Sequence, residues 1–353
     1  MTNTSYPPSS SSEINVNVLA DYLFAHLDLT HTQRDSMALE KFSGGQSNPT
    51  YLLNAKDKRF VLRRQPFGKL LKSAHAVDRE FRVLSALAET NVPVPKTYHL
   101  CEDPSVIGSM FYIMEFIPGR ILWDSALPDV KRPETRRSMY QEMVNVMAAL
   151  HDVDFKQVGL EDYGRPGNYF ERQVSRWTKQ YRQSELTRIN DMETLISWLE
   201  VNLPADDGAL SIVHGDYRLD NVIFAPDSPQ ILAVVDWELS TLGHPLADLA
   251  YQCMQLRLPA NVGHAPGLGG VNRAALGIPS ESEYLGWYCE NRGISHIDNW
   301  HFYLAFSFFR LAAIAQGVAK RAEAGNASNT KAKEVGALVA PLAAMAVNLI
   351  NQA

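Results

Sequence analysis

The sequence predicts an α+β protein of two lobes, a small β-rich lobe followed by a large, mainly helical one. Short β-rich segments and tight turns fill the first third of the chain, and segments with helical periodicity fill most of the remainder. Strands followed by helices are typical of α+β proteins, and 353 residues can bury a substantial core. We assign residues 1–12 to a disordered tail, 13–117 to the N-terminal lobe and 118–353 to the C-terminal lobe.

The N-terminal lobe is predicted to begin with a capping helix over residues 13–40, because Val16, Leu19, Leu23 and Leu27 are spaced for one apolar face. A hairpin with its turn at Lys56-Asp57-Lys58, one helix and one further strand should follow. Their expected ranges are 50–53 and 59–64 for the hairpin strands, 73–90 for the helix and 110–116 for the last strand.

The C-terminal lobe is predicted to be a set of helices around a short β-rich passage, residues 211–236, with a Gly- and Pro-rich loop at 259–280. The expected helices cover residues 133–151, 169–202, 245–258, 281–291, 299–323 and 331–351. The apolar stretch Phe302–Ala319 carries Arg310 in its middle, so we interpret it as a buried helix and expect no membrane partner.

Composition narrows the functional classes. The formal net charge is −6 and no Lys/Arg-rich run is present, which argues against a nucleic-acid partner. The three cysteines lie far apart without a CxxC motif, so a disulfide framework and a zinc site are not expected. A reducing, cytoplasmic location is the expectation. The N-terminus lacks the apolar core of a signal peptide.

The motif HGDYRLDN, residues 214–221, is the strongest functional signal. Asp216 and Asn221 have the spacing of a kinase catalytic loop, in which the carboxylate receives a hydroxyl proton and the amide holds a metal ion. Arg218 is expected to face the transferring phosphoryl group. The rival interpretation, a hydrolytic metal bound by His214 and Asp216, needs further ligands that the sequence does not offer at suitable spacing. We expect His214 to brace the loop.

A second hairpin should complete a metal site. Residues 222–224 and 231–235 are predicted strands, so antiparallel pairing would bring Asn221 and Asp236 to the same end. Amide and carboxylate oxygens suit Mg²⁺, which binds through one or two carboxylates and substrate phosphates.

These motifs resemble those of the aminoglycoside phosphotransferase-like kinases. The resemblance runs from about Phe42 to Leu249 and includes FVLRR, DREFRVLSAL, YIMEFIPG, HGDYRLDN and VVDWELSTLGHPLADLAY. FVLRRQPFGKLLKSAH and GRPGNYFERQVSRW look closest to the branch found as the phosphotransferase domain associated with acyl-CoA dehydrogenases. The resemblance implies a protein-kinase-like two-lobed fold, with ATP and Mg²⁺ as cofactors.

The resemblance also implies a nucleotide site. It places a phosphate-covering loop at Ser43, Gly44, Gly45, Gln46, Ser47 and Asn48, and adenine-binding backbone at Glu115 and Phe116. Arg63 occupies the position of the usual lysine, and Glu80 lies on the core-facing side of its helix. A buried cation and a buried carboxylate each require a partner, so we expect an Arg63–Glu80 ion pair. We expect Asp248 to anchor the catalytic loop. Glu238 follows the predicted metal ligand Asp236, and its role is left open, with a contact near the metal as one option.

The expected acceptor is the hydroxyl of a small molecule. No APE motif follows Asp236, and the chain soon enters HPLADLAY, which leaves no room for a peptide-docking segment. An anionic hydroxy acid or hydroxyacyl-CoA would suit five residues near the expected acceptor site, for which the alternative is that they coat a helix: Arg165, Tyr169, Arg172, Arg176 and Trp177. An aminoglycoside, choline or a sugar is the alternative, and a non-catalytic nucleotide-binding protein is the alternative of another class.

Overall fold

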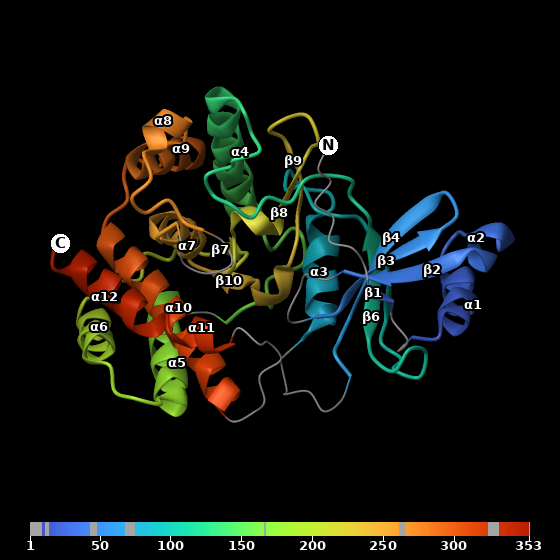
Figure 1. Ribbon diagram of the computed structural model, residues 1–353, viewed down its shortest axis with the longest axis horizontal. Coiled ribbons are helices and arrows are strands. Elements are labelled where there is room, and N and C mark those ends of the chain that lie inside the picture. The colour runs from blue at the N-terminus through green and yellow to red at the C-terminus, as the bar shows by residue number, and fades with distance from the viewer. Residues whose placement is uncertain are drawn as a thin grey trace. The chain divides into compact units, whose positions relative to one another are not determined.

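The computed structural model describes residues 9–10, 14–42, 48–67, 75–165, 167–260, 266–323 and 332–352 (Figure 1). The chain forms two compact units. The first comprises residues 1–121, 158–160 and 221–240, and the second comprises 122–157, 161–220 and 241–353. The chain is therefore an α+β protein, as predicted, but residues 221–240 belong to the first unit and not, as expected, with the helical part.

The first unit contains an antiparallel sheet with strand order β1-β2-β3-β4-β6-β5. Strands β3 (Thr50–Ala55) and β4 (Lys58–Arg64) form the predicted hairpin, with Lys56 at φ +55° in its turn. The other strands are β1 (Ser9–Ser10), β2 (Met37–Lys41), β5 (Thr97–Cys101) and β6 (Phe111–Glu115). The prediction missed β5, and Ser9–Ser10 pairs with β2 although a disordered tail was expected there.

Two helices and a strand replace the single helix predicted over residues 13–40. Helix α1 (Val16–His26) ends before Leu27, and α2 (His31–Asp35) starts at a capping box formed by Thr30 and Gln33. This cap satisfies backbone donors at a new helix start and so interrupts the periodic segment. Residues 37–41 then pair with β3, which gives their backbone groups partners in the sheet.

Helices cover both faces of this sheet. Leu19 and Leu23 of α1 belong to one buried cluster with Phe60 and Leu62 of β4. Helix α3 (Val77–Leu87) reaches the opposite face, where its Glu80 contacts Arg63. Side chains alternate along a strand, so Leu62 and Arg63 point to opposite faces. Arg63 of β4 therefore lies on the face of the sheet that α3 covers.

A separate hairpin of β8 (Val222–Phe224) and β9 (Ile231–Val234) also belongs to the first unit. Its backbone forms hydrogen bonds with the backbone of Arg120 and of Pro93. Gly119 permits the close approach of the chain beside Arg120 to the hairpin. A Cβ atom on Gly119 would lie 2.5 Å from Phe224 O. These bonds explain why the hairpin groups with the sheet and not with the helices that flank it in sequence. The short 3₁₀ turns η1 (Leu219–Asn221) and η2 (Trp237–Leu239) flank the hairpin.

The second unit is mainly helical, with β7 (Ser211–Val213) and β10 (Thr241–Gly243) paired antiparallel. Helix α10 (Trp300–Glu323) packs against α5, α7 and α12. The other helices are α4 (Pro133–Asp152), α5 (Tyr169–Ser184), α6 (Asn190–Val201), α7 (Leu246–Arg257), α8 (Arg273–Leu276), α9 (Glu281–Arg292), α11 (Ala332–Gly336) and α12 (Val339–Ile350).

Two predicted helices are each divided in the structure. The segment 169–202 splits into α5 and α6, and the segment 331–351 splits into α11 and α12. Pro341 lies in the first turn of α12, where its missing N–H costs no helical hydrogen bond. Helix α10 is long and apolar enough to cross a membrane by composition, but 78% of its most apolar window is buried in the protein. This burial is typical of a core helix, as the sequence analysis expected.

Candidate active site

The backbone of residues 214–216 is anchored by one carboxylate of α7. Asp248 accepts the His214 N–H at 2.6 Å with Oδ2 and the Gly215 N–H at 2.8 Å with Oδ1. Gly215 has φ +81°, a conformation that favours glycine. The Asp216 N–H donates to His214 Nδ1 at 3.2 Å. These contacts confirm that Asp248 anchors the loop and that His214 braces it.

The electrostatics of this anchor favour a charged carboxylate. Asp248 is fully buried, yet its pKa is lowered, because the effect of burial is outweighed by His151, His214 and the backbone hydrogen bonds. His151 lies 3.4 Å from Asp248 and donates or accepts a second hydrogen bond with Tyr288. Burial lowers the pKa of His151.

Asp216 projects from this loop and is bound by a second residue of α7. Its carboxylate forms a hydrogen bond with the Tyr251 hydroxyl. Tyr251 lies three residues after Asp248, so the two side chains share a face of the helix. Burial raises the pKa of Asp216, against the opposing effects of Arg218, His214 and Tyr251. The predicted catalytic carboxylate is thus partly buried and held by specific contacts.

Two arginines accompany Asp216. Arg218 pairs with Asp220 at 2.5 Å within the loop and lowers the pKa of Asp216. Arg310 of α10 donates from Nη2 to Gly215 O at 2.6 Å. Its guanidinium carbon lies 5.3 Å from the centre of the Tyr251 ring and 5.7 Å from that of Trp177. No sequence motif predicted a role for Tyr251 or Arg310, although a charge inside an apolar helix is a visible signal for Arg310.

In the first unit, Arg63 and Glu80 form the expected ion pair. Arg63 Nε lies 2.7 Å from Glu80 Oε2, and both side chains are buried. Asn48 and Tyr112 each donate a further hydrogen bond of 2.9 Å to Glu80. Burial opposes the charge of Arg63, but Glu80 and Asp236 outweigh it and raise the pKa of Arg63. Burial also raises the pKa of Glu80.

Arg63 also binds the carboxylates that follow the β8–β9 hairpin. It forms an ion pair with Asp236 and lies 3.7 Å from Glu238. Val235 N donates to Asn221 O at 2.9 Å, so the hairpin brings residues 221 and 236 to the same end, as predicted. Asp236 itself is in the left-handed region at φ 66°, an uncommon conformation that often marks a functional residue.

The donor set at this end of the hairpin fits a hard divalent cation. One carboxylate oxygen from each of Glu80, Asp236 and Glu238 can lie within 4.8 Å of the others. The Asn221 side chain at the same hairpin end is mostly buried. All of these donors are oxygens, the ligands that Mg²⁺ requires. The Arg63 guanidinium binds the same carboxylates, so a bound metal ion and Arg63 would share these ligands.

The structure describes three further residues of the predicted nucleotide site: Glu115, Phe116 and Asn48. Glu115 ends β6 and accepts the Lys96 N–H at 3.2 Å, and the Arg59 guanidinium lies 4.3 Å above the Phe116 ring. Asn48 is buried beside Glu80. The remaining residues of the predicted phosphate loop, Ser43–Ser47, lie outside the described residues.

The five predicted acceptor residues have different surroundings. Arg172 donates to the carbonyl oxygens of Gly167 and Arg165, so its guanidinium is held by the turn before α5. Arg165 and Arg176 are exposed. Tyr169 and Trp177 are buried, Trp177 lies against Arg310, and the charge of Arg310 acts on the Tyr169 hydroxyl. The structure thus brings Trp177 to Arg310, and the charges of Arg310, Arg176 and Arg172 all lower the pKa of Tyr169 against the effect of burial.

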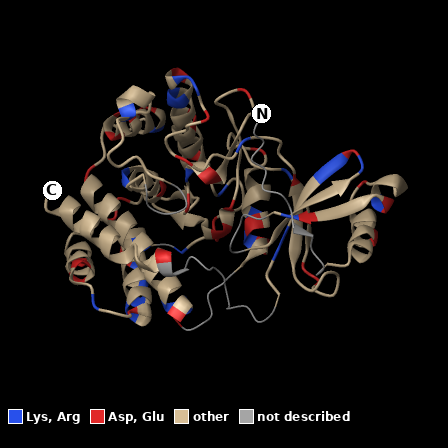
Figure 2. Ribbon diagram, in the orientation of Figure 1, with Lys and Arg blue, Asp and Glu red and all other residues tan. Residues whose placement is uncertain are grey.

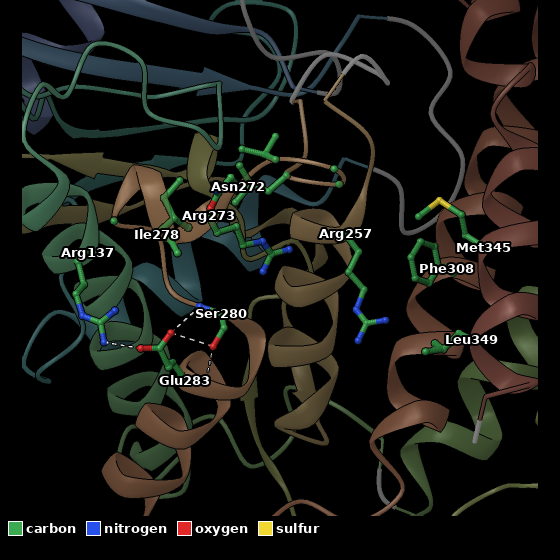
Figure 3. A pocket seen from close by; sticks show the side chains of 16 residues that line it. Arg137, Arg257, Asn272, Arg273, Ile278, Ser280, Glu283, Phe308, Met345 and Leu349 are labelled. Atoms are coloured by element: carbon green, nitrogen blue, oxygen red, sulfur yellow. Dashed lines mark hydrogen bonds and ion pairs between the residues drawn. The ribbon is translucent and has the colours of Figure 1, made fainter.

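The second unit also contains a cavity of about 800 Å³ that no motif predicted (Figure 3). Arg137, Arg257 and Arg273 line it together with the apolar side chains of Phe308 and Leu349. Figure 3 shows Arg137 joined to Glu283. Arg257 forms two 2.6 Å hydrogen bonds with Glu281, and Arg273 donates to Leu256 O. The volume suits a small molecule, but existing partners engage each guanidinium. In Figure 2 charged residues of both signs are scattered over the described helices.

The phosphotransferase enzyme family model matches residues 38–277, a span that contains both groups of site residues. The chain belongs to this family. A crystal structure of a Ralstonia eutropha JMP134 protein, described as a candidate aminoglycoside phosphotransferase, is 45% identical and has a TM-score of 0.86, covering 96% of this chain and 99% of that one. The fold is also that of choline kinase from Cryptosporidium parvum, with a TM-score of 0.66 at 12% identity over 96% and 97% of the two chains.

Curated relatives are longer proteins. Acyl-CoA dehydrogenase family member 10 of Mus musculus is 47% identical over 96% of this chain and 31% of its own length. Probable acyl-CoA dehydrogenase IBR3 of Arabidopsis thaliana is 44% identical over 91% of this chain and 42% of its own length. The chain therefore spans about a third to two fifths of these relatives. The predicted family and protein-kinase-like fold are confirmed.

Proposed function

We propose that this phosphotransferase moves the γ-phosphoryl group of ATP to a hydroxyl of a small molecule in a Mg²⁺-dependent reaction. The observation that carries the proposal is the Asp216 carboxylate, which is held by a fully anchored backbone and by Tyr251. A carboxylate that accepts a proton must be positioned within hydrogen-bond reach of the acceptor. The anchor supplies that positioning, and the family membership supports the reaction class.

The residues of the chain have distinct roles in this proposal. Asp216 orients the acceptor hydroxyl and takes its proton late in an in-line transfer. Arg63 and Arg218 offset phosphate charge, each held in place by a carboxylate. Asn221 and Asp236 would hold Mg²⁺, which neutralises phosphate charge when bound. Asp216 and Asn221 lie on one short segment, residues 214–221, and Asp236 follows the β8–β9 hairpin.

The proposed acceptor is an anionic hydroxy acid or a hydroxyacyl-CoA. The names of the relatives that share this segment, acyl-CoA dehydrogenase family members, support an acyl compound. An aminoglycoside, choline or sugar acceptor is the alternative. A non-catalytic nucleotide-binding protein would be expected to have lost a catalytic group, whereas Asp216, Asn221 and Asp236 are all present.

The test is an ADP-release screen with Mg-ATP over hydroxy acids, their CoA esters, aminoglycosides, choline and sugars. Asp216→Asn is the matched blank, because it keeps the size of the side chain and removes the proton acceptor. Turnover on one acceptor class that is absent in the variant supports the proposal and identifies the acceptor. Turnover that the variant retains would contradict the role of Asp216, and ATP binding without turnover on any acceptor would favour the non-catalytic alternative.

A further inference from the structure

Arg310 is a buried cation that lacks an ionic partner within the described part of the chain. The residue is 7% exposed, and none of the described carboxylates forms an ion pair with it. Its Nη2 donates to a neutral carbonyl, Gly215 O, while its Nε is buried without an acceptor. A guanidinium has five N–H donors, so most of its hydrogen-bonding capacity is unused by these described contacts.

Three other arginines of the described site and cavity are paired with carboxylates. Arg63 pairs with Glu80 and Asp236, Arg218 pairs with Asp220, and Arg257 pairs with Glu281. A buried charge is costly unless it is paired. Arg310 differs from these three arginines, and its surrounding residues indicate a function for its charge.

Two aromatic rings and the backbone of the Asp216 loop surround the Arg310 guanidinium. The guanidinium lies over the rings of Trp177 and Tyr251, contacts that do not neutralise its charge. Tyr251 joins Arg310 directly to Asp216, because its ring contacts the guanidinium and its hydroxyl bonds the carboxylate. A planar guanidinium with free N–H groups matches a carboxylate or phosphate in two parallel hydrogen bonds.

We propose that Arg310 binds the anionic group of the phosphoryl acceptor while Asp216 binds its hydroxyl. This inference rests on the proposed function and assigns the acceptor a second recognition element, a carboxylate or a phosphate ester. Tyr251 contacts both Arg310 and Asp216, so the two binding groups lie near each other. The acceptor hydroxyl and its oxyanion must therefore be carried on one short molecule or on one end of a longer one.

A purely structural role for Arg310 makes a different prediction. If the guanidinium only holds Gly215 O, its removal should disturb Asp216 equally for every acceptor. If it binds an oxyanion, its removal should harm charged acceptors selectively. The discriminating measurement is the ratio of kcat/KM for a hydroxycarboxylate to kcat/KM for its primary amide, which has nearly the same size but no charge.

The experiment compares wild type, Arg310→Gln and Arg310→Lys, with Arg321→Gln as the control at the exposed end of the same helix. We expect Arg310→Gln to lower kcat/KM for the acid by about 10- to 100-fold, mainly through KM, and to change the amide by less than about 3-fold. Arg310→Lys, which keeps a positive charge, should retain part of the wild-type preference for the acid over the amide. A hydroxyalkyl phosphate in the same assay tells a phosphate site from a carboxylate site. Circular dichroism and ATP binding confirm that each variant is folded.

An equal loss for acid and amide, or no loss for either, would overturn the inference. If the wild-type protein phosphorylates none of the acceptors, the proposed function has failed independently of the anion site. Calorimetric titration of butanoate and of butanamide without nucleotide then still tests whether Arg310 binds an anion. Butanoate binding that is stronger than butanamide binding and is lost in Arg310→Gln supports the site. Binding that is absent in wild type or unchanged in Arg310→Gln refutes it.

Discussion

Arg63 Nε lies 2.7 Å from Glu80 Oε2, and the same guanidinium contacts Asp236. Removing one member of this group leaves an uncompensated charge in a buried position. We expect Arg63→Ala to lower the free energy of unfolding by about 3–5 kcal/mol, measured by urea denaturation. The control is Arg34→Ala, which breaks an exposed ion pair with Asp21 and should leave the midpoint almost unchanged. Equal effects of the two substitutions would contradict the importance of burial.

Asp248→Asn should destabilise the protein and slow turnover, because an amide offers one acceptor where two backbone N–H groups now bind. The expected loss is about 1–3 kcal/mol for the unsatisfied donor. The folded pKa of Asp248 is lowered, so its contribution is complete above the ordinary pKa of about 3.9 and is lost as the pH falls through the lower folded value. The stability difference between variant and wild type should therefore shrink below about pH 3.9, as chemical denaturation at several pH values would show. A constant difference would argue against the ionised anchor.

Asp216→Asn should abolish turnover and stabilise the fold. Burial raises the folded pKa of Asp216, so the ionised form is less stable in the folded protein than in the unfolded chain. This penalty is present at pH 7 and disappears below the ordinary pKa of about 3.9, where both states are protonated. Thermal melts at pH 7 should show a higher midpoint for the variant. Asp129→Asn, at an exposed position, is the control, and a lower midpoint for Asp216→Asn would show that the carboxylate is not penalised.

Tyr251→Phe should shift the acid limb of the pH–rate profile to higher pH. The Tyr251 hydroxyl stabilises the ionised Asp216 and so lowers its pKa. Without that hydrogen bond, Asp216 is protonated at a higher pH and loses its function as proton acceptor earlier. A fall in kcat without movement of the acid limb would assign Tyr251 to packing alone.

Asp236→Ala should remove metal-dependent turnover. The substitution deletes the carboxylate that closes the β8–β9 hairpin but leaves Asn221 and Asp216 in place. Activity should then no longer respond to Mg²⁺ concentration, and chelation should reduce wild type to the level of the variant. A fully active variant would exclude Asp236 as a metal ligand.

The sequence predicted those parts of the site that depend on short-range patterns of strands, turns and helices. The hairpin of residues 222–234 follows from two short strands around a turn, and the Arg63–Glu80 pair follows from side-chain alternation on one strand and periodicity on one helix. Strand β5 and the strand at 37–41 were missed, although each pairs with the strand that follows it in the chain. The roles of Tyr251 and Arg310 depend on the packing of α7 and α10 around one loop, which no local pattern encodes.

The position of Arg310 also matters during synthesis. Helix α10 is the described helix whose length and composition would let it enter a bilayer, and Arg310 lies near its centre. An arginine at the middle of such a segment raises the apparent free energy of membrane insertion by about 2.5–3.5 kcal/mol. The same guanidinium therefore opposes capture of the nascent segment by the insertion machinery, and replacing it with leucine would remove that barrier before folding begins.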